Sequence, residues 1–156
     1  VDFVAAPVFA RPENMRDGEA SFVLSGASRA AVDAAAAVLE AAAPPERLFR
    51  FMPPKQGDDD DDNRGGDPGA ACVAKLCGNF MIGASIQVIA EGLALAEAND
   101  VDRCAMMDML RSTIFDCAIF RGYGHRVSRR EHPVDGAFAL ALGLKDVGLA
   151  LDAAHA

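Results

Sequence analysis

The stretch GAACVAKLCGNFMIGASIQVIAEGLALAEAN, residues 69–99, decides how this sequence is organised. Apolar residues recur through it at helical spacing over about 30 residues, which is long for a helix of a globular protein. Asp67 and Pro68 precede it as an expected N-cap and first helical residue, and Asn99 is typical of a helix end. Residues 67–99 are therefore predicted to form one long helix.

One face of this helix is apolar except at its N-terminal end. With steps of about 100° per residue, six residues share that face: Lys75, Asn79, Ile82, Ile86, Ile89 and Leu93. Burial lowers the pKa of a lysine, which suits proton transfer near neutral pH, and an asparagine one turn later could hold a substrate hydroxyl or carbonyl. The alternative is a lysine that extends to water, with an incidental asparagine beside it.

An α/β layer is predicted ahead of the long helix. Alternating and β-forming residues indicate three strands, at 1–8, 21–25 and 47–52. A helix is expected over 29–43, with Ser28 as its N-cap and a Pro-Pro pair after it. Residues 9–20 are expected to form a loop. Strand, helix and strand in this order are typical of an α/β layer.

Residues 53–66 differ in kind, because they combine a Pro-Pro pair, Gly-Gly and five consecutive aspartates at 58–62. An exposed acidic insertion is the prediction, and a cation-binding patch is the alternative. After the long helix, three more helices are expected at 102–113, 116–130 and 136–155. The predicted fold class is α+β, with an α/β part followed by an all-helical part.

Two further cationic side chains stand out. Arg11 lies in the loop PVFARP that follows the first strand and could clamp a carboxylate, or it is a surface residue of a turn. In the last helix, Lys145 shares the spacing of Phe138, Leu142 and Leu149, and Asp146 follows it. This places Lys145 on an apolar face or at the edge of a packing face.

Composition narrows the classes of protein. With 51% hydrophobic residues the chain is not disordered throughout, and its net charge of −8 argues against nucleic acids and anionic membranes as partners. The most apolar run, 80–90, contains Ser85 and Gln87, so no membrane-spanning segment is expected. The four cysteines show no C-x-x-C spacing. We expect reduced, mostly buried thiols, no metal site, and a reducing compartment, the cytoplasm or an organelle matrix.

Four stretches together resemble the β-hydroxyacid dehydrogenase family, which includes 3-hydroxyisobutyrate dehydrogenase and glyoxylate/succinic semialdehyde reductase. They are APVFARPE at 6–13, DPGAACVAKLCGNF at 67–80, AEGLALAE at 90–97 and GLKDVGLALDAA at 143–154. The resemblance covers the chain except for about 53–66. The Lys-x-x-x-Asn and Lys-Asp elements are specific when they occur together.

The resemblance implies a layout. Residues 1–52 would be the end of a Rossmann domain that binds NAD or NADP, and 53–66 an insertion. Residues 67–99 would be the interdomain helix, and 100–156 part of a helical domain like the C-terminal domain of 6-phosphogluconate dehydrogenase. That helical domain forms homodimers in the family, so a homo-oligomer is expected.

The resemblance also implies roles for residues of the site. Lys75 would be the catalytic general acid/base, with Asn79 binding substrate beside it. The substrate carboxylate would lie on the loop that contains Phe9, Ala10 and Arg11.

On the cofactor side, Lys145 and Asp146 would lie at the nicotinamide end of NADP or NAD. The reaction implied is hydride transfer between the nicotinamide and a small hydroxyacid or its aldehyde. Related imine reductases often differ at the lysine position, so Lys75 favours carbonyl chemistry.

Three departures from the family qualify this expectation. Ala5 replaces an aspartate, Ala10 replaces a glycine, and no Gly-x-Gly-x-x-Gly fingerprint follows a strand. The chain is therefore predicted to be an internal fragment that is inactive alone. The alternative is a non-catalytic helical module for assembly or interaction, a remnant of the family.

Overall fold

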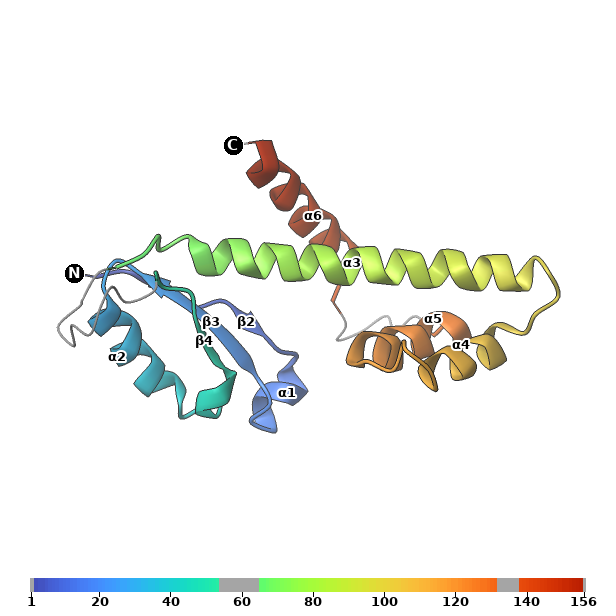
Figure 1. The fold of residues 1–156 in the computed structure, drawn as a ribbon, viewed down its shortest axis with the longest axis horizontal. Helices are drawn as coiled ribbons and strands as arrows, with labels where there is room; N and C mark the ends of the chain where they lie inside the picture. Colours follow the sequence, from blue (N-terminus) through green and yellow to red (C-terminus); the bar gives the residue numbers. More distant parts are fainter. Residues whose placement is uncertain (1, 54–64, 132–137, 156) are drawn as a thin grey trace. The chain divides into compact units, whose positions relative to one another are not determined.

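The computed structural model describes residues 2–53, 65–131 and 138–155. The chain divides into two compact units, Val1–Cys77 and Gly78–Ala156, and is a mixed α/β chain that is mostly helical (Figure 1). The long helix α3, Ala70–Glu97, contributes residues to both units.

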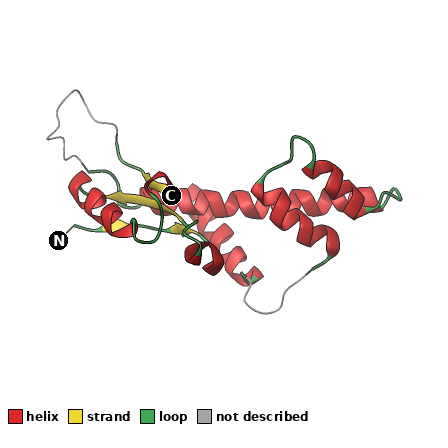
Figure 2. Ribbon diagram, turned by 90° about the horizontal axis from the view of Figure 1, so that it is seen from below, coloured by secondary structure: helices red, strands yellow, loops and turns green. Residues whose placement is uncertain are grey.

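The sheet of the first unit is built around β3, Ser21–Gly26, and Figure 2 shows its strands in yellow. Two short strands, β1 (Val4–Ala5) and β2 (Val8–Phe9), pair antiparallel with β3. On the other edge, β4 (Leu48–Arg50) pairs with it in parallel. The prediction of one strand over 1–8 is wrong, because Pro7, which has no N–H, separates β1 from β2.

Helix α2 (Arg29–Leu39) connects β3 to β4 through the 3₁₀ turn η1 (Pro45–Arg47). The Ser28 hydroxyl accepts a hydrogen bond from the Ala31 N–H at 3.2 Å, which confirms the predicted N-cap. The predicted strand–helix–strand order is also confirmed. Its core consists of small and aliphatic side chains with one phenylalanine: Ala20, Phe22, Leu24, Val32, Ala36, Ala43 and Leu48.

The sequence predicted a loop over 9–20. This prediction is wrong in part, because the segment contains the short helix α1 (Pro12–Arg16). Pro12 opens the helix, where its missing N–H costs nothing, and Glu13 lies in the first turn, where a negative charge is favourable. Five residues are too few to show a helical period, so the pattern gave no signal.

The predicted long helix is confirmed as α3, which has 28 residues. The expectation of no membrane-spanning segment is wrong by length and composition, since an 18-residue window of α3 has a mean hydropathy of 1.5. The sequence prediction failed because alanines and glycines extend the apolar run beyond 80–90. A core helix of a soluble protein meets the same criterion but is mostly buried, whereas 6% of this window is buried among the described residues. The helix also carries an ionisable Lys75 and a hydrogen-bonded Asn79.

The second unit adds four helical segments after α3. They are α4 (Arg103–Arg111), the π-helical turn η2 (Phe120–Gly124), α5 (His125–Arg129) and α6 (Leu140–His155). The Asp102 carboxylate caps α4 by accepting from the Ala105 N–H at 2.7 Å. The helix predicted over 116–130 corresponds to η2 and α5. Ile89, Leu93 and Met107 form the buried core of this unit.

The cysteines correct a further expectation. All four are free thiols, but Cys72, Cys77 and Cys117 are exposed rather than buried. Cys72 and Cys77 lie on sides of α3 that no described residue covers, which the composition alone did not indicate. The predicted acidic insertion lies outside the described residues over 54–64.

Candidate active site

In the first unit, Lys75 lies in the second turn of α3 and is half-buried. Its Nζ lies 3.8 Å from the centroid of the Phe9 ring, within the range of a cation–π interaction. Phe9 ends β2 and begins the predicted substrate loop. The structure therefore brings the predicted proton donor into contact with the predicted carboxylate-binding loop.

A buried hydroxyl fixes the start of α3. Ser25 of β3 donates to the Pro68 carbonyl at 2.7 Å, and its Oγ accepts from the Ala71 N–H at 2.9 Å. Ala71 packs against Val23 of the same strand. Because Lys75 follows Ala71 by one turn, these contacts set the position of Lys75 relative to the sheet.

Sequence reasoning missed the role of Ser25. A hydroxyl in a strand whose other residues are nearly all buried was the available signal, since a buried hydroxyl is normally hydrogen-bonded.

The rest of the predicted loop is held between β2 and α1. Arg11 is the N-cap residue of α1, and its backbone N–H donates to Asn14 Oδ1 at 3.0 Å. Ala10 is half-buried and packs against the core around Leu24. The backbone of these residues is thereby tied to the same sheet that carries Phe9.

In the second unit, Asn79 and Asp146 form a hydrogen bond although they are 67 residues apart in sequence. Asn79 Nδ2 donates to Asp146 Oδ2 at 2.7 Å, and Lys145 Nζ lies 2.8 Å from Asp146 Oδ1. Asp146 is 8% exposed, whereas the Lys145 side chain is 60% exposed. The structure thus brings Asn79, predicted to bind substrate, to the Lys145–Asp146 pair, predicted to lie at the cofactor.

The orientation of α6 corrects the helical-face prediction. Phe138, Leu142 and Leu149 were expected to form a packing face with Lys145, but these side chains are exposed. The buried position is Asp146, one residue beyond Lys145. Periodicity identifies an apolar face but does not show what covers it, and a hydrogen bond to Asn79 decided which side of α6 is buried.

The predicted stripe along α3 is confirmed at its C-terminal end. Ile89 and Leu93 are buried with Met107. Ile82 and Ile86 are half-buried, as are Lys75 and Asn79.

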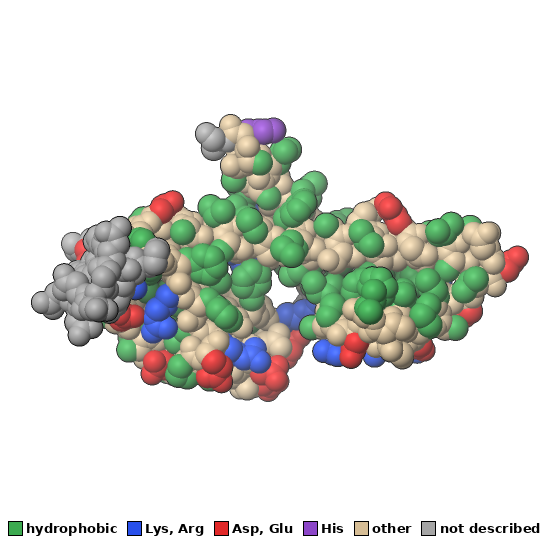
Figure 3. Space-filling view, viewed as in Figure 1, with side chains coloured by type: hydrophobic (Ala, Val, Ile, Leu, Met, Phe, Trp, Pro, Cys, Tyr) green, Lys and Arg blue, Asp and Glu red, His purple; other side chains and the backbone are tan. Residues whose placement is uncertain are grey.

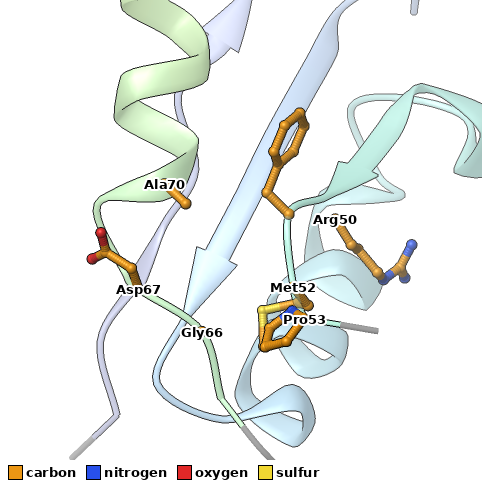
Figure 4. A pocket seen from close by; sticks show the side chains of 7 residues that line it. Arg50, Met52, Pro53, Gly66, Asp67 and Ala70 are labelled. Carbon is orange, nitrogen blue, oxygen red and sulfur yellow. The ribbon is translucent and has the colours of Figure 1, made fainter. Parts of the chain in front are cut away.

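An open pocket of about 420 Å³ lies between β4 and the start of α3 (Figure 4). It is lined by residues 50–53, Gly66, Asp67 and Ala70. Its two charged side chains already have partners, since Arg50 pairs with Asp33 at 2.9 Å and Asp67 accepts from the Gly69 N–H. Lys75 does not line it, so we do not assign the chemistry to this pocket.

A metal site needs several His, Cys, Asp or Glu side chains close together. In ranges 2–53, 65–131 and 138–155, no three His, Cys, Asp or Glu side chains lie close enough to hold a metal ion.

Solved structures share this fold. The chain is 22% identical to 3-hydroxyisobutyrate dehydrogenase from Salmonella typhimurium, with a TM-score of 0.71 over 97% of this chain and 47% of that one. The chain is 21% identical to the Mycobacterium tuberculosis 3-hydroxyisobutyrate dehydrogenase with L-serine, with a TM-score of 0.66 over 96% of this chain and 47% of that one. Its identity to Psf3 in complex with NADP⁺ and 2-OPP is 16%, with a TM-score of 0.57 over 91% of this chain and 51% of that one. The chain spans about half the length of these proteins.

A search of curated proteins found no significant match. A scan against protein families matched residues 69–156, more than half of the chain, to a family described as NAD-binding of NADP-dependent 3-hydroxyisobutyrate dehydrogenase. The matched segment contains Lys75, Asn79, Lys145 and Asp146. The chain therefore belongs to the NAD-binding family of NADP-dependent 3-hydroxyisobutyrate dehydrogenase.

Proposed function

We propose that this chain forms part of an oxidoreductase that transfers a hydride between NADP or NAD and a small β-hydroxyacid or its aldehyde. The observation that carries the proposal is the Lys75 ammonium over the ring of Phe9, at the start of the expected substrate loop. Membership of the NAD-binding family supports the choice of cofactor.

Lys75 acts in this proposal as the general acid/base. During reduction its ammonium donates a proton to the carbonyl oxygen, and during oxidation the neutral amine takes the proton of the hydroxyl. The Phe9 ring holds the ammonium at one end of the site. A bound nicotinamide dinucleotide supplies or accepts the hydride.

The loop at 9–11 and Asn79 bind the substrate. A small carboxylate suits the Arg11 guanidinium, which can bind it in a bidentate manner. The amide of Asn79, one helical turn after Lys75 on α3, binds the oxygen at the reacting carbon.

On the cofactor side, the donor set fits only the nicotinamide end. Lys145 is largely exposed and is held by Asp146, so its ammonium is accessible to polar groups of a ribose or carboxamide. The sequence contains no Gly-x-Gly-x-x-Gly turn, so these 156 residues offer no familiar cradle for a pyrophosphate.

For the layout, we propose that 1–52 correspond to the end of a Rossmann domain, 53–66 to an insertion, 67–99 to an interdomain helix and 100–156 to a helical domain. Self-association through that helical domain accompanies the proposal. The partners are a small carboxylate substrate and a second copy, without nucleic acid or membrane, in a reducing compartment.

The test uses the full-length polypeptide in which this chain occurs, with oxidation of NADPH or NADH followed by absorbance. We expect Lys75→Ala to lower kcat by about 10²–10⁴-fold. Lys75→Arg should lower kcat by a similar factor, because a guanidinium stays protonated and can neither give up its proton to the carbonyl oxygen nor take one from the hydroxyl. Gln87→Ala, an exposed position of α3, is the control. A kcat of Lys75→Ala within a few-fold of wild type would refute the assignment.

A second candidate is a non-catalytic helical module that assembles through its apolar faces. The observation that favours it is the set of exposed apolar side chains on α3 and α6, drawn in green in Figure 3. Self-association with no turnover by the full-length polypeptide would favour this module over the enzyme.

A further inference from the structure

Asp146 is the one buried charged side chain among the residues that the structure describes. A carboxylate that is removed from water needs hydrogen-bond partners, and α3 and α6 each supply one. Asn79 of α3 reaches one of its oxygens at 2.7 Å, and Lys145 of α6 reaches the other at 2.8 Å. A single carboxylate thus holds both an expected substrate ligand and an expected cofactor ligand.

The chemistry of this contact fixes the orientation of the Asn79 amide. An ionised carboxylate only accepts hydrogen bonds, so it selects the NH₂ group of the amide. The carbonyl Oδ1 of Asn79 is then the end of the amide that does not bind Asp146. In that orientation Asn79 offers Oδ1 as a hydrogen-bond acceptor and the second N–H of its amide as a donor, and either a hydroxyl oxygen or a carbonyl oxygen can accept from that N–H.

We propose that Asp146 is a positioning residue: it orients Asn79 so that the second N–H of the amide donates a hydrogen bond to the oxygen at the reacting carbon, and it holds Lys145 on its other oxygen. This inference rests on the proposed function and deepens it. Asp146 acts through its two neighbours, which refines the expectation that it binds the cofactor itself.

The kinetic test compares 3-hydroxyisobutyrate with its semialdehyde in the full-length polypeptide. Asp146→Asn is nearly isosteric, but the new amide can donate a hydrogen bond. The Asn79 amide can then bind it through Oδ1 instead of through its NH₂ group, in a flipped orientation. We expect the KM of this variant for both substrates to rise by about tenfold or more, while kcat changes by less than about threefold. Asp146→Glu keeps a carboxylate and should recover part of the loss.

The matched control is Asp152→Asn, the same change at an exposed position of α6, which should leave both KM values unchanged. Unchanged KM values in Asp146→Asn, or a fall in kcat alone, would overturn the positioning role.

A second measurement does not need turnover. In the ¹⁵N spectrum of the 156-residue chain, the side-chain NH₂ signals of Asn79 are assigned through their loss in Asn79→Ala. We expect Asp146→Asn to shift them and Asp152→Asn to leave them in place. Unshifted signals would overturn the inference even in an active enzyme, whereas normal activity of Lys75→Ala would overturn only the proposed function.

Discussion

The two units bury their apolar side chains to very different extents. In the first unit, Leu24 and Val32 are fully buried between the sheet and α2. In the second unit, the buried core consists of Ile89, Leu93 and Met107, while Leu140 and Leu144 of α6 are 89% and 73% exposed. The first unit thus has the larger buried core, although Phe3 and Val38 of that unit are exposed.

This difference has an energetic meaning. Each Å² of apolar surface left in water forgoes about 25 cal/mol of stabilisation, and contiguous apolar patches usually mark interaction sites. The matched solved structures are about twice as long as this chain. We therefore expect mutations in the first unit to act on folding and mutations on α6 to act on association.

The largest effect on the free energy of unfolding is expected when the same substitution, leucine to alanine, is made in each unit and the two variants are compared. Leu24→Ala removes a fully buried side chain and should lower the free energy of unfolding by about 2–5 kcal/mol. Leu144→Ala should change it by less than about 0.5 kcal/mol. Urea denaturation followed by circular dichroism measures both. Similar losses for the two variants would show that α6 is buried in solution.

A smaller effect is expected for the hydroxyl that fixes α3. Ser25→Ala leaves the buried N–H of Ala71 without its acceptor, which should cost about 1–3 kcal/mol of unfolding free energy. Ser85→Ala is the control, because its hydroxyl donates to the Met81 carbonyl on an exposed face of the same helix. If both variants unfold at the same urea concentration, the Ser25 contacts do not stabilise the start of α3.

The smallest effect on unfolding is expected for Leu144→Glu, which adds a charge to the exposed face of α6. Its unfolding free energy should stay within about 0.5 kcal/mol of wild type, whereas self-association should weaken by about tenfold or more. Sedimentation velocity over a concentration series measures this. Val38→Glu, at an exposed site of α2, provides the comparison. An equal effect of the two charges would locate the self-association elsewhere than on α6.

Elements with strong local signals were predictable. Ser28 and Asp102 predicted the starts of two helices. The long run of apolar residues at helical spacing predicted the length of α3. Proline splitting of the first strand and the five-residue α1 were missed, because neither leaves a periodic pattern. The exposed cysteines were missed because burial depends on what covers a helix, not on residue type.

The candidate site was predictable as a set of residues but not as an arrangement. Lys75, Asn79, Lys145 and Asp146 were identified from spacing and from the family resemblance. Their contacts were not, since the hydrogen bond between Asn79 and Asp146 joins positions 67 residues apart. The role of Ser25 was likewise hidden, because its partners, Pro68 and Ala71, come from a distant segment.

The amino-acid sequence alone specified the local structure, the length of α3 and the residue types that can carry acid–base chemistry, because helix periods and caps depend on neighbouring residues and ionisable groups depend on residue type. The packing of the elements is what puts the Lys75 ammonium on the Phe9 ring and makes Asp146, rather than Lys145, the buried residue of α6. Such contacts depend on which elements pack together, and burying a charge is tolerated only where the fold supplies its partners.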